Sequence, residues 1–158
     1  MFCCNFSITD YKTNKEIKVE GFTNWEGVSQ KMSPPVSHLD DCHLNHYALQ
    51  LSMYMFIILK HNPKLKPGTL TIHHILFEEA GKDAYDNRVV LYDEFGEPVV
   101  NSVVEYEVPY LKNEVISIIN KLKDVYLEID TYINTMSTYS QAMFIQAYVI
   151  LKQFKIYM

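Results

Sequence analysis

The sequence contains little arginine and little cysteine. Thirteen of its 14 basic residues are lysines, and Arg88 is the single arginine. Phosphate contacts would therefore be made mostly by flexible point charges and not by bidentate guanidinium forks, which weakens the case for base-specific readout. The three cysteines, Cys3, Cys4 and Cys42, are an odd number and two of them are adjacent. A disulfide framework or a four-thiolate metal site is therefore not expected, and a reducing cytosol fits best.

Long apolar runs are also missing. The longest, Met53 to Leu59, is far shorter than the roughly 20 residues of a membrane-spanning helix. The N-terminus lacks the basic start and apolar centre of a secretion signal. No glycine-rich phosphate loop is present, and no Ser-His-Asp arrangement stands out. We therefore expect a soluble protein of the cytoplasm.

The composition is that of one globular domain. Of the 158 residues, 48% are hydrophobic and 21% are charged, which argues against the disordered and coiled-coil classes. The net charge of −5 gives no global attraction for a polyanion, so nucleic acid would have to bind a local patch. Seven of the 14 basic residues lie in the first 66 positions and either line such a patch or are ordinary solvated lysines: Lys12, Lys15, Lys18, Lys31, Lys60, Lys64 and Lys66.

The first 37 residues predict short strands and an irregular connection. Phe6 to Tyr11 alternates apolar and polar residues, which is typical of a half-buried strand. Ile17 to Glu20 alternates again and predicts a short second strand. Gly21 to Ser37 contains Pro34-Pro35, which no helix can cross, and it is expected to be an irregular surface segment.

A long helix is predicted from about Asp40 to His61. Asp40 and Asp41 suit its N-cap, and Asn62-Pro63 supplies a stop. Helical spacing gives it two separate stripes. The apolar stripe contains Ala48, Leu51, Met55 and Ile58, and the polar and aromatic stripe contains His43, Tyr47, Gln50 and Tyr54.

The C-terminal part predicts strands followed by helices. Leu70 to Phe77 is rich in β-forming residues, and within it His73 and His74 point to opposite faces and cannot hold one metal ion together. A polar loop is expected over Glu78 to Arg88, followed by strands over Val89 to Tyr92 and Pro98 to Val108 that a turn at Asp93 to Gly96 joins. A helix is expected over Leu111 to Asn134, with an interruption at Ser137 to Ser140. The last segment, Gln141 to Ile156, is apolar and is expected to be buried here or in a partner. The architecture is a mixed α/β fold.

Asp10-Tyr11-Lys12, at the end of the first predicted strand, is the main candidate for chemistry. Residues two apart point to the same side of a strand, so Asp10 and Lys12 share a face. A carboxylate can hold Mg²⁺ while the neighbouring ammonium positions the attacking water and offsets charge on a phosphate, as phosphodiester hydrolysis requires. Most isolated triplets of this kind are solvated strand ends, so the triplet alone proves little.

The order of two motifs resembles the PD-(D/E)XK nuclease superfamily, in its RecB-like branch. In that branch a strand carries D/E-x-K and the next helix carries Q-x-x-x-Y, and this sequence has Asp10-Tyr11-Lys12 followed by Gln50-Leu51-Ser52-Met53-Tyr54. The resemblance covers about Asn5 to Lys123. It implies a restriction-endonuclease-like mixed sheet flanked by helices over residues 1–123, with a helical extension over residues 124–158.

The resemblance implies a metal-dependent, exonuclease-like cleavage of DNA. Asp10 and the backbone carbonyl of Tyr11 would bind Mg²⁺ or Mn²⁺, and Lys12 would act in catalysis. By analogy with short members of this branch, the source would be a phage or a mobile element, and a phage protein would work in the host cytoplasm. The four-cysteine iron–sulfur cluster of some members is not expected, because the chain has only three cysteines.

Further roles follow from the same resemblance. Gln50 and Tyr54 are one helical turn apart and would position the DNA strand, with Lys15 and Tyr47 as additional DNA contacts. We therefore expect this helix stripe to share a cavity with the acid and the amine of the strand. The alternative interpretation makes Gln50 and Tyr54 buried hydrogen-bonding residues that tie the helix to the sheet.

The chain departs from the family pattern at its start. Catalytic members add a metal-binding Asp from a preceding strand and usually a Glu from an earlier helix, whereas only nine residues precede Asp10 and none is acidic. We therefore expect an N-terminally truncated nuclease whose missing acid comes from a second polypeptide or protomer. The alternatives are a misplaced start codon, a remnant that binds DNA or assembles with a partner without cutting, and Glu20 in the vacant position.

A second group of potential ligands precedes the long helix. It contains His38, Asp40, Asp41, His43 and His46. Zinc could use such side chains. Helix capping accounts for both aspartates, however, and is the preferred interpretation.

Overall fold

The computed structural model describes residues 5–135. The chain divides into two compact units, Met1–Ser117 and Ile118–Met158, whereas the sequence suggested a division after residue 123. The expected interruption at Ser137–Ser140 and the apolar segment Gln141–Ile156 lie outside the described residues. The elements in chain order are β1 (Asn5–Lys12), α1 (His43–His61), β2 (Lys66–Phe77), β3 (Glu79–Lys82), β4 (Arg88–Val90), β5 (Val100–Val108) and α2 (Lys112–Thr135).

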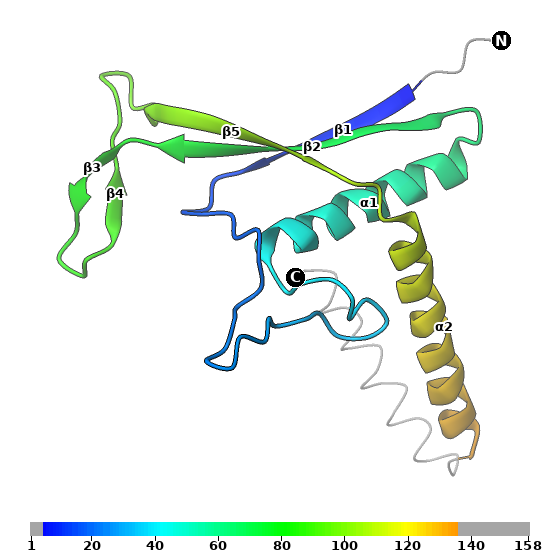
Figure 1. Cartoon of the computed structure of the whole chain (residues 1–158). Helices are drawn as coiled ribbons and strands as arrows, with labels where there is room; N and C mark the ends of the chain where they lie inside the picture. The colour runs from blue at the N-terminus through cyan, green and yellow to red at the C-terminus, as the bar shows by residue number, and fades with distance from the viewer. Residues whose placement is uncertain (1–4, 136–158) are drawn as a thin grey trace. The chain divides into compact units, whose positions relative to one another are not determined.

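Three strands of the first unit form a mixed sheet in the order β1-β2-β5 (Figure 1). β1 runs parallel to β2, and β5 runs antiparallel to β2. The two parallel strands approach closely at Gly68, where a Cβ would lie 2.5 Å from Ser7 Oγ and 2.9 Å from the Phe6 carbonyl oxygen. The expected mixed α/β architecture is thus confirmed, and within the described residues β1 is an edge strand of its sheet.

The helix α1 covers one face of this sheet (Figure 1). Burial of apolar surface between the two layers is the main force that holds them together, and Leu51, Met55 and Ile72 are fully buried there. The apolar helix stripe predicted from the sequence forms much of this core. The buried residues of the whole core are Ile17, Ala48, Leu51, Met55, Leu70, Ile72 and Val108.

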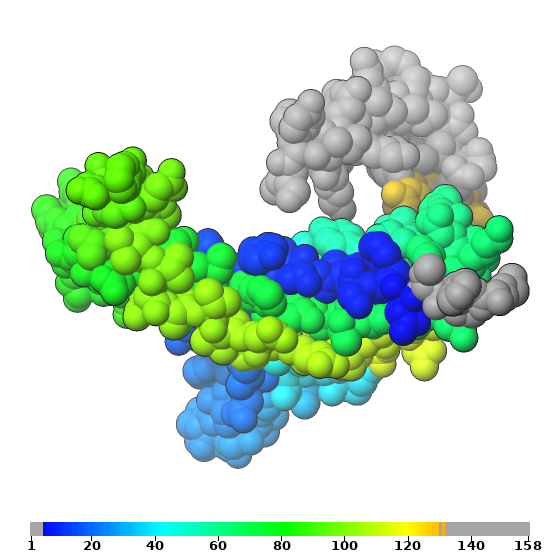
Figure 2. Space-filling model, turned by 90° about the horizontal axis from the view of Figure 1, so that it is seen from above, coloured from blue at the N-terminus to red at the C-terminus, as the bar shows by residue number. Residues whose placement is uncertain are grey.

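The opposite face of the three strands is open in Figure 2. The register places Tyr11, His73 and Glu105 side by side across β1, β2 and β5 on this face. His74 points the other way and is only 3% exposed. The prediction that His73 and His74 face opposite sides is confirmed.

The start of α1 differs from the expectation, whereas its end at His61 agrees with it. The N-cap is Cys42, and no side chain caps the helix, so the assignment of Asp40 and Asp41 as caps was wrong. Both carboxylates are used elsewhere: Asp40 accepts a hydrogen bond of 2.6 Å from Lys31 Nζ, and Asp41 accepts one of 2.9 Å from Gln30 Nε2. A carboxylate engaged by another side chain cannot serve the orphan N–H groups of a helix.

The segment Ile17–Glu20 is not a strand, so this prediction was also wrong. Its backbone serves the start of α1 instead of a sheet. The Leu44 N–H donates a 3.0 Å hydrogen bond to the Lys18 carbonyl oxygen, and the Lys18 N–H donates a 3.2 Å bond to His43 Nδ1. Ile17 is 8% exposed and packs into the core as a single residue, which explains its apolar character without a strand.

The expected polar loop at Glu78–Arg88 contains strand structure, which corrects a third prediction. β3 and β4 pair as an antiparallel hairpin, and Arg88 forms an ion pair with Glu79 across it. Every residue of β3 is exposed, so the strand has no apolar alternation by which the sequence could reveal it. The expected strands that follow are present as the shorter β4 and β5.

The helix α2 agrees with the prediction to within one residue at each end. Its start is joined to α1, because the Leu111 N–H donates a 2.9 Å hydrogen bond to Ser52 Oγ. Val115, in the first turn, is fully buried. Neither helix in the described part of the chain combines the length and the apolar composition that a membrane crossing requires.

Candidate functional site

The strand β1 directs Asp10 and Lys12 toward α1. Its residues alternate between exposed and partly buried, and these two belong to the partly buried set, beside Ile72 and His74 of β2. Their side chains are 28% and 18% exposed, and Lys12 Nζ lies 2.9 Å from Asp10 Oδ2. The acid and the amine therefore share one face, as the alternation of a strand requires.

The helix α1 brings an amide and a phenol to the same place. Lys12 Nζ donates a 3.4 Å hydrogen bond to Gln50 Oε1, across 38 positions of sequence. Gln50 Nε2 donates a 2.8 Å hydrogen bond to the Tyr54 hydroxyl. Because Tyr54 is 45% exposed, this series of polar contacts starts at a partly buried carboxylate and ends at the surface, where a substrate can reach it.

Further residues surround Lys12. Its ammonium nitrogen lies 4.3 Å from the centroid of the Tyr47 ring, which is a cation–π contact. The Tyr47 hydroxyl donates a 3.0 Å hydrogen bond to Asn14 Oδ1, and His74 Nε2 lies 2.6 Å from the Asn14 carbonyl oxygen, so this nitrogen carries the proton. Asn14 and His74 were not among the site residues predicted from the sequence. Strand alternation indicates the direction of His74, but no sequence signal shows that the carbonyl group of Asn14 lies next to its ring.

The surroundings of Lys12 define what it can do. A carboxylate, an amide oxygen and the face of an aromatic ring are all groups that attract a cation. An ammonium held in this way is placed to offset negative charge that develops on a phosphate.

Asp10 has an acceptor that its neighbours do not fully use. Oδ1 accepts a 2.9 Å hydrogen bond from the N–H of Tyr11. Oδ2 is buried and accepts no well-aligned hydrogen bond within the described residues, although the Lys12 ammonium is close. We take that contact as electrostatic, because the distance is short and the alignment poor. A buried oxygen without an aligned donor is costly, so Oδ2 is the atom that an added ligand would use.

Asp10 alone does not complete a magnesium site. Mg²⁺ requires six oxygen ligands in near-octahedral geometry and is usually held by one or two carboxylates with water and phosphate. No group of three or more His, Cys, Asp or Glu side chains within residues 5–135 could hold a metal ion. The neighbouring inward positions on β2 and β5 add no acid, since they are Ile72, His74, Val104 and Tyr106.

The predicted contribution of Tyr11 is limited to its backbone. Its side chain lies on the face of the sheet away from α1, is 62% exposed, and makes an edge-on contact with the ring of His73 at 5.4 Å. Only the carbonyl group could therefore join a metal shell with Asp10.

The second group of potential ligands forms no metal site within the described residues. His46 Nε2 lies 2.7 Å from Asp41, and His38 Nε2 lies 3.2 Å from Glu114. The hydrogen bonds that Asp40 accepts from Lys31 and, to a lesser extent, from Ser29 lower the pKa of its carboxyl group. Glu20, the alternative metal ligand, lines a pocket at the start of α1 with members of this group, and that pocket does not include Asp10.

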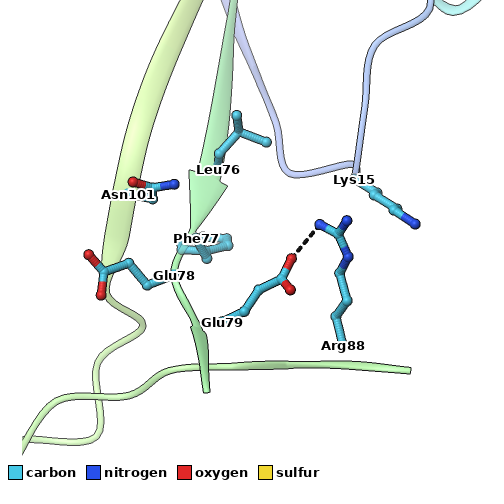
Figure 3. Close-up of a pocket in the computed structure, with 7 residues that line it drawn as sticks. All are labelled: Lys15, Leu76, Phe77, Glu78, Glu79, Arg88 and Asn101. Carbon is cyan, nitrogen blue, oxygen red and sulfur yellow. Dashed lines mark ion pairs between the residues drawn. The ribbon is translucent and has the colours of Figure 1, made fainter. Parts of the chain in front are cut away.

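Lys15 lies beyond the end of β1, outside the contacts around Lys12. It lines a separate cavity at the base of the β3–β4 hairpin (Figure 3). Figure 3 shows the side chains of Glu79 and Arg88 directed toward each other, Lys15 beside Arg88 with its ammonium directed away from Glu79, and Glu78 directed away from Arg88. Lys66 lies opposite Asn5 in the register of β1 and β2, at the other end of β1. The N-terminal lysines therefore do not line one continuous groove.

Comparisons of the chain with models of protein families, with curated proteins and with solved structures found no match. The function of the site must therefore be argued from the chemistry of its own side chains. A carboxylate, an ammonium, an amide and a phenol meet on one side of the sheet. Such groups can bind a phosphodiester and stabilise charge on it.

Proposed function

We propose that this chain is part of a Mg²⁺-dependent DNA nuclease and contributes an Asp-x-Lys half-site for phosphodiester hydrolysis. The observation that carries the proposal is the contact series from Asp10 through Lys12 and Gln50 to Tyr54. It joins two short motifs that are distant in sequence into one partly exposed polar cluster. The resemblance to RecB-like nucleases supports the same assignment.

The residues of this chain bind the strand and offset its charge. The Lys12 ammonium faces the position of the scissile phosphate and stabilises the charge that develops there. Gln50 and Tyr54 hydrogen-bond to the backbone of the DNA strand, and Tyr54, which is 45% exposed, is the more accessible of the two residues. Tyr47 holds Lys12 in place through the cation–π contact with its ring. A divalent cation, when bound, would supply Lewis-acid activation of water and of the phosphate.

A second carboxylate must come from outside the described cluster, and the fold offers a place for it. Within the described residues, no strand pairs with the outer edge of β1. Such an edge presents free N–H and C=O groups on which another strand can add. An added strand would lie about 4.8 Å away, next to Asp10. We propose that a second polypeptide or protomer binds there and brings the missing acid.

The proposal is tested by cleavage of linear DNA in the presence of Mg²⁺ or Mn²⁺. The chain is assayed alone and together with the protein encoded beside it. Asp10→Asn is expected to lower the cleavage rate by about 100-fold or more, because it removes the one carboxylate that can hold the metal. Asp40→Asn changes a carboxylate that is also paired with a lysine and should leave the rate unchanged. Equal rates for the wild type and Asp10→Asn would refute the assignment.

A second candidate function is a DNA-binding or assembly module without catalysis. The observation in its favour is that Asp10 and Lys12 already neutralise each other at 2.9 Å. Such a module would bind DNA with a steep salt dependence and show no Mn²⁺ binding that depends on Asp10, even with its partner present. Metal binding that is lost in Asp10→Asn would exclude it.

A further inference from the structure

A polar cavity lies at the base of the β3–β4 hairpin, outside the proposed site. The cavity has a volume of about 530 Å³ and lies where β2 continues into the β3–β4 hairpin; its lining includes Lys15, Phe77, Glu79 and Arg88. A smaller cavity of about 190 Å³ shares these residues and adds Asn14. The single arginine of the chain is thus placed in a cavity with a lysine, and no part of the proposed catalytic cluster accounts for it.

Two cations and two acids line this cavity. Arg88 forms an ion pair with Glu79, and Lys15 lies beside Arg88 with its ammonium directed away from Glu79 (Figure 3). Within residues 5–135, no ion pair joins Lys15 to a carboxylate, whereas Lys12, Lys18, Lys31 and Lys82 are each paired with one. Glu78 also lines the cavity but points away from Arg88. The Lys15 ammonium and the unused donors of Arg88 are therefore the groups that this cavity offers to an anion.

The donors suit a phosphate group. A guanidinium has five N–H donors, so Arg88 can keep Glu79 on one side and offer the rest of its fork to a second anion. The Lys15 ammonium adds a flexible point charge. A phosphate oxygen placed between them would receive charge-assisted hydrogen bonds from both residues.

The cavity lies near the end of β2, close to the proposed catalytic cluster. Leu76, which lines the cavity, is two residues beyond His74 and shares its side of the strand, and the next residue, Phe77, lines the cavity as well. Asn14 connects the two places, because its side chain accepts the Tyr47 hydroxyl while the residue lines the smaller cavity. Lys12 and Lys15 are three positions apart and lie within about 11 Å of each other.

We propose that this cavity binds a backbone phosphate of the nucleic acid strand whose scissile phosphate lies at Lys12, with Arg88 and Lys15 as its ligands. A strand carries one phosphate for about every 3.4 Å of helix axis, so the two sites are a few nucleotides apart. The hairpin then serves as a strand guide. This inference rests on the proposed function, since it uses Lys12 to place the strand.

The inference is tested by binding of a fluorescently labelled single-stranded DNA oligonucleotide to the full chain, with a chelator present so that no cleavage occurs. Arg88→Ala should weaken binding about tenfold, as expected for loss of charge-assisted hydrogen bonds. It should also reduce the salt dependence by about one phosphate contact. Lys64→Ala removes an exposed positive charge elsewhere and should change binding less than twofold. Equal effects of these two variants would overturn the inference.

A second pair of variants guards against misfolding of the hairpin. Glu79→Gln removes the acid that competes for Arg88 and should tighten binding severalfold, which a damaged fold cannot do. Glu78→Gln makes the same change of charge one residue away, on a side chain directed away from Arg88, and should have little effect. If both variants tighten binding equally, the effect is one of overall charge and the phosphate site is wrong.

The two proposals can fail separately. If Asp10→Asn abolishes cleavage while Arg88→Ala and Lys64→Ala bind DNA equally, only the phosphate site is refuted. If Arg88→Ala binds weakly but Asp10→Asn still cuts DNA, the catalytic assignment is refuted while the cavity remains a nucleic acid contact.

Discussion

Two lysine–aspartate pairs of this chain have similar lengths and different surroundings. Lys12 lies 2.9 Å from Asp10, and these side chains are 18% and 28% exposed. Lys31 lies 2.6 Å from Asp40, and these side chains are 49% and 31% exposed. The first pair continues through Gln50 into the helix α1, whereas the second adds a hydrogen bond from Ser29 in its own loop.

The difference shows that a candidate site depends on what surrounds an ion pair more than on the pair itself. Lys31 and Asp40 are nine residues apart and close an exposed loop, a contact of the kind that contributes little to stability. Lys12 and Asp10 face a helix whose polar side chains come from far away in the sequence. Only the first pair therefore combines restricted solvent access with further groups that can bind a substrate.

Removal of the core behind the first pair should have the largest effect. Leu51 is fully buried and holds α1, with the adjacent Gln50, against the sheet. Leu51→Ala is expected to lower the free energy of unfolding by about 2–5 kcal/mol, because it leaves a cavity. Urea denaturation measures this value. A loss below about 1 kcal/mol, the level of an average substitution, would show that α1 is not packed on the sheet in this way.

Removal of the amide next to the first pair should have an intermediate effect. Gln50→Ala is expected to lower kcat/KM for DNA cleavage about tenfold, since one hydrogen bond to a charged group is lost. Gln30 is a matched control, because its amide nitrogen donates a 2.9 Å hydrogen bond to Asp41 beside the second pair. Gln30→Ala should leave kcat/KM unchanged. Equal losses in both variants would contradict the distinction between the two regions.

The second pair should show the smallest effect, visible only through its pH dependence. The pKa of Asp40 is lowered from its ordinary value of 3.8, chiefly by the hydrogen bond from Lys31. A lowered pKa in the folded state stabilises the fold above the unfolded pKa, and this contribution disappears as the pH falls through the folded value. The urea midpoint of the wild type should therefore exceed that of Asp40→Asn at neutral pH and approach it as the pH falls below the ordinary pKa of 3.8. A difference that persists in acid would contradict the ion-pair explanation.

The parts of the fold that follow a regular period were predictable from the sequence. Alternation predicted β1, and with it the common face of Asp10 and Lys12. Helical spacing predicted that Gln50 and Tyr54 lie together on one side of α1. These periods determine direction within an element. They do not determine which elements meet, and the contact between Lys12 and Gln50 was expected only from the resemblance to a nuclease family.

Two of the errors have a common physical cause, which is competition for hydrogen-bonding groups from residues outside the predicted element. Asp40 has the right residue type and position for an N-cap, but Lys31 and Ser29 bind its carboxylate. The segment at Lys18 has the alternation of a strand, yet its carbonyl group accepts the N–H of Leu44 at the start of α1. The strand β3 is exposed throughout, so backbone pairing and not apolar burial accounts for it.

The most direct test of the account compares the two lysines in a DNA cleavage assay with Mg²⁺ or Mn²⁺ and the protein encoded beside this chain. Lys12→Ala is expected to lower the cleavage rate by about 100-fold or more, because it removes the charge that stabilises the reacting phosphate. Lys31→Ala, which breaks the ion pair with Asp40, should change the rate less than twofold, because that pair is exposed. A Lys12→Ala variant that cuts DNA as fast as Lys31→Ala would contradict the central claim.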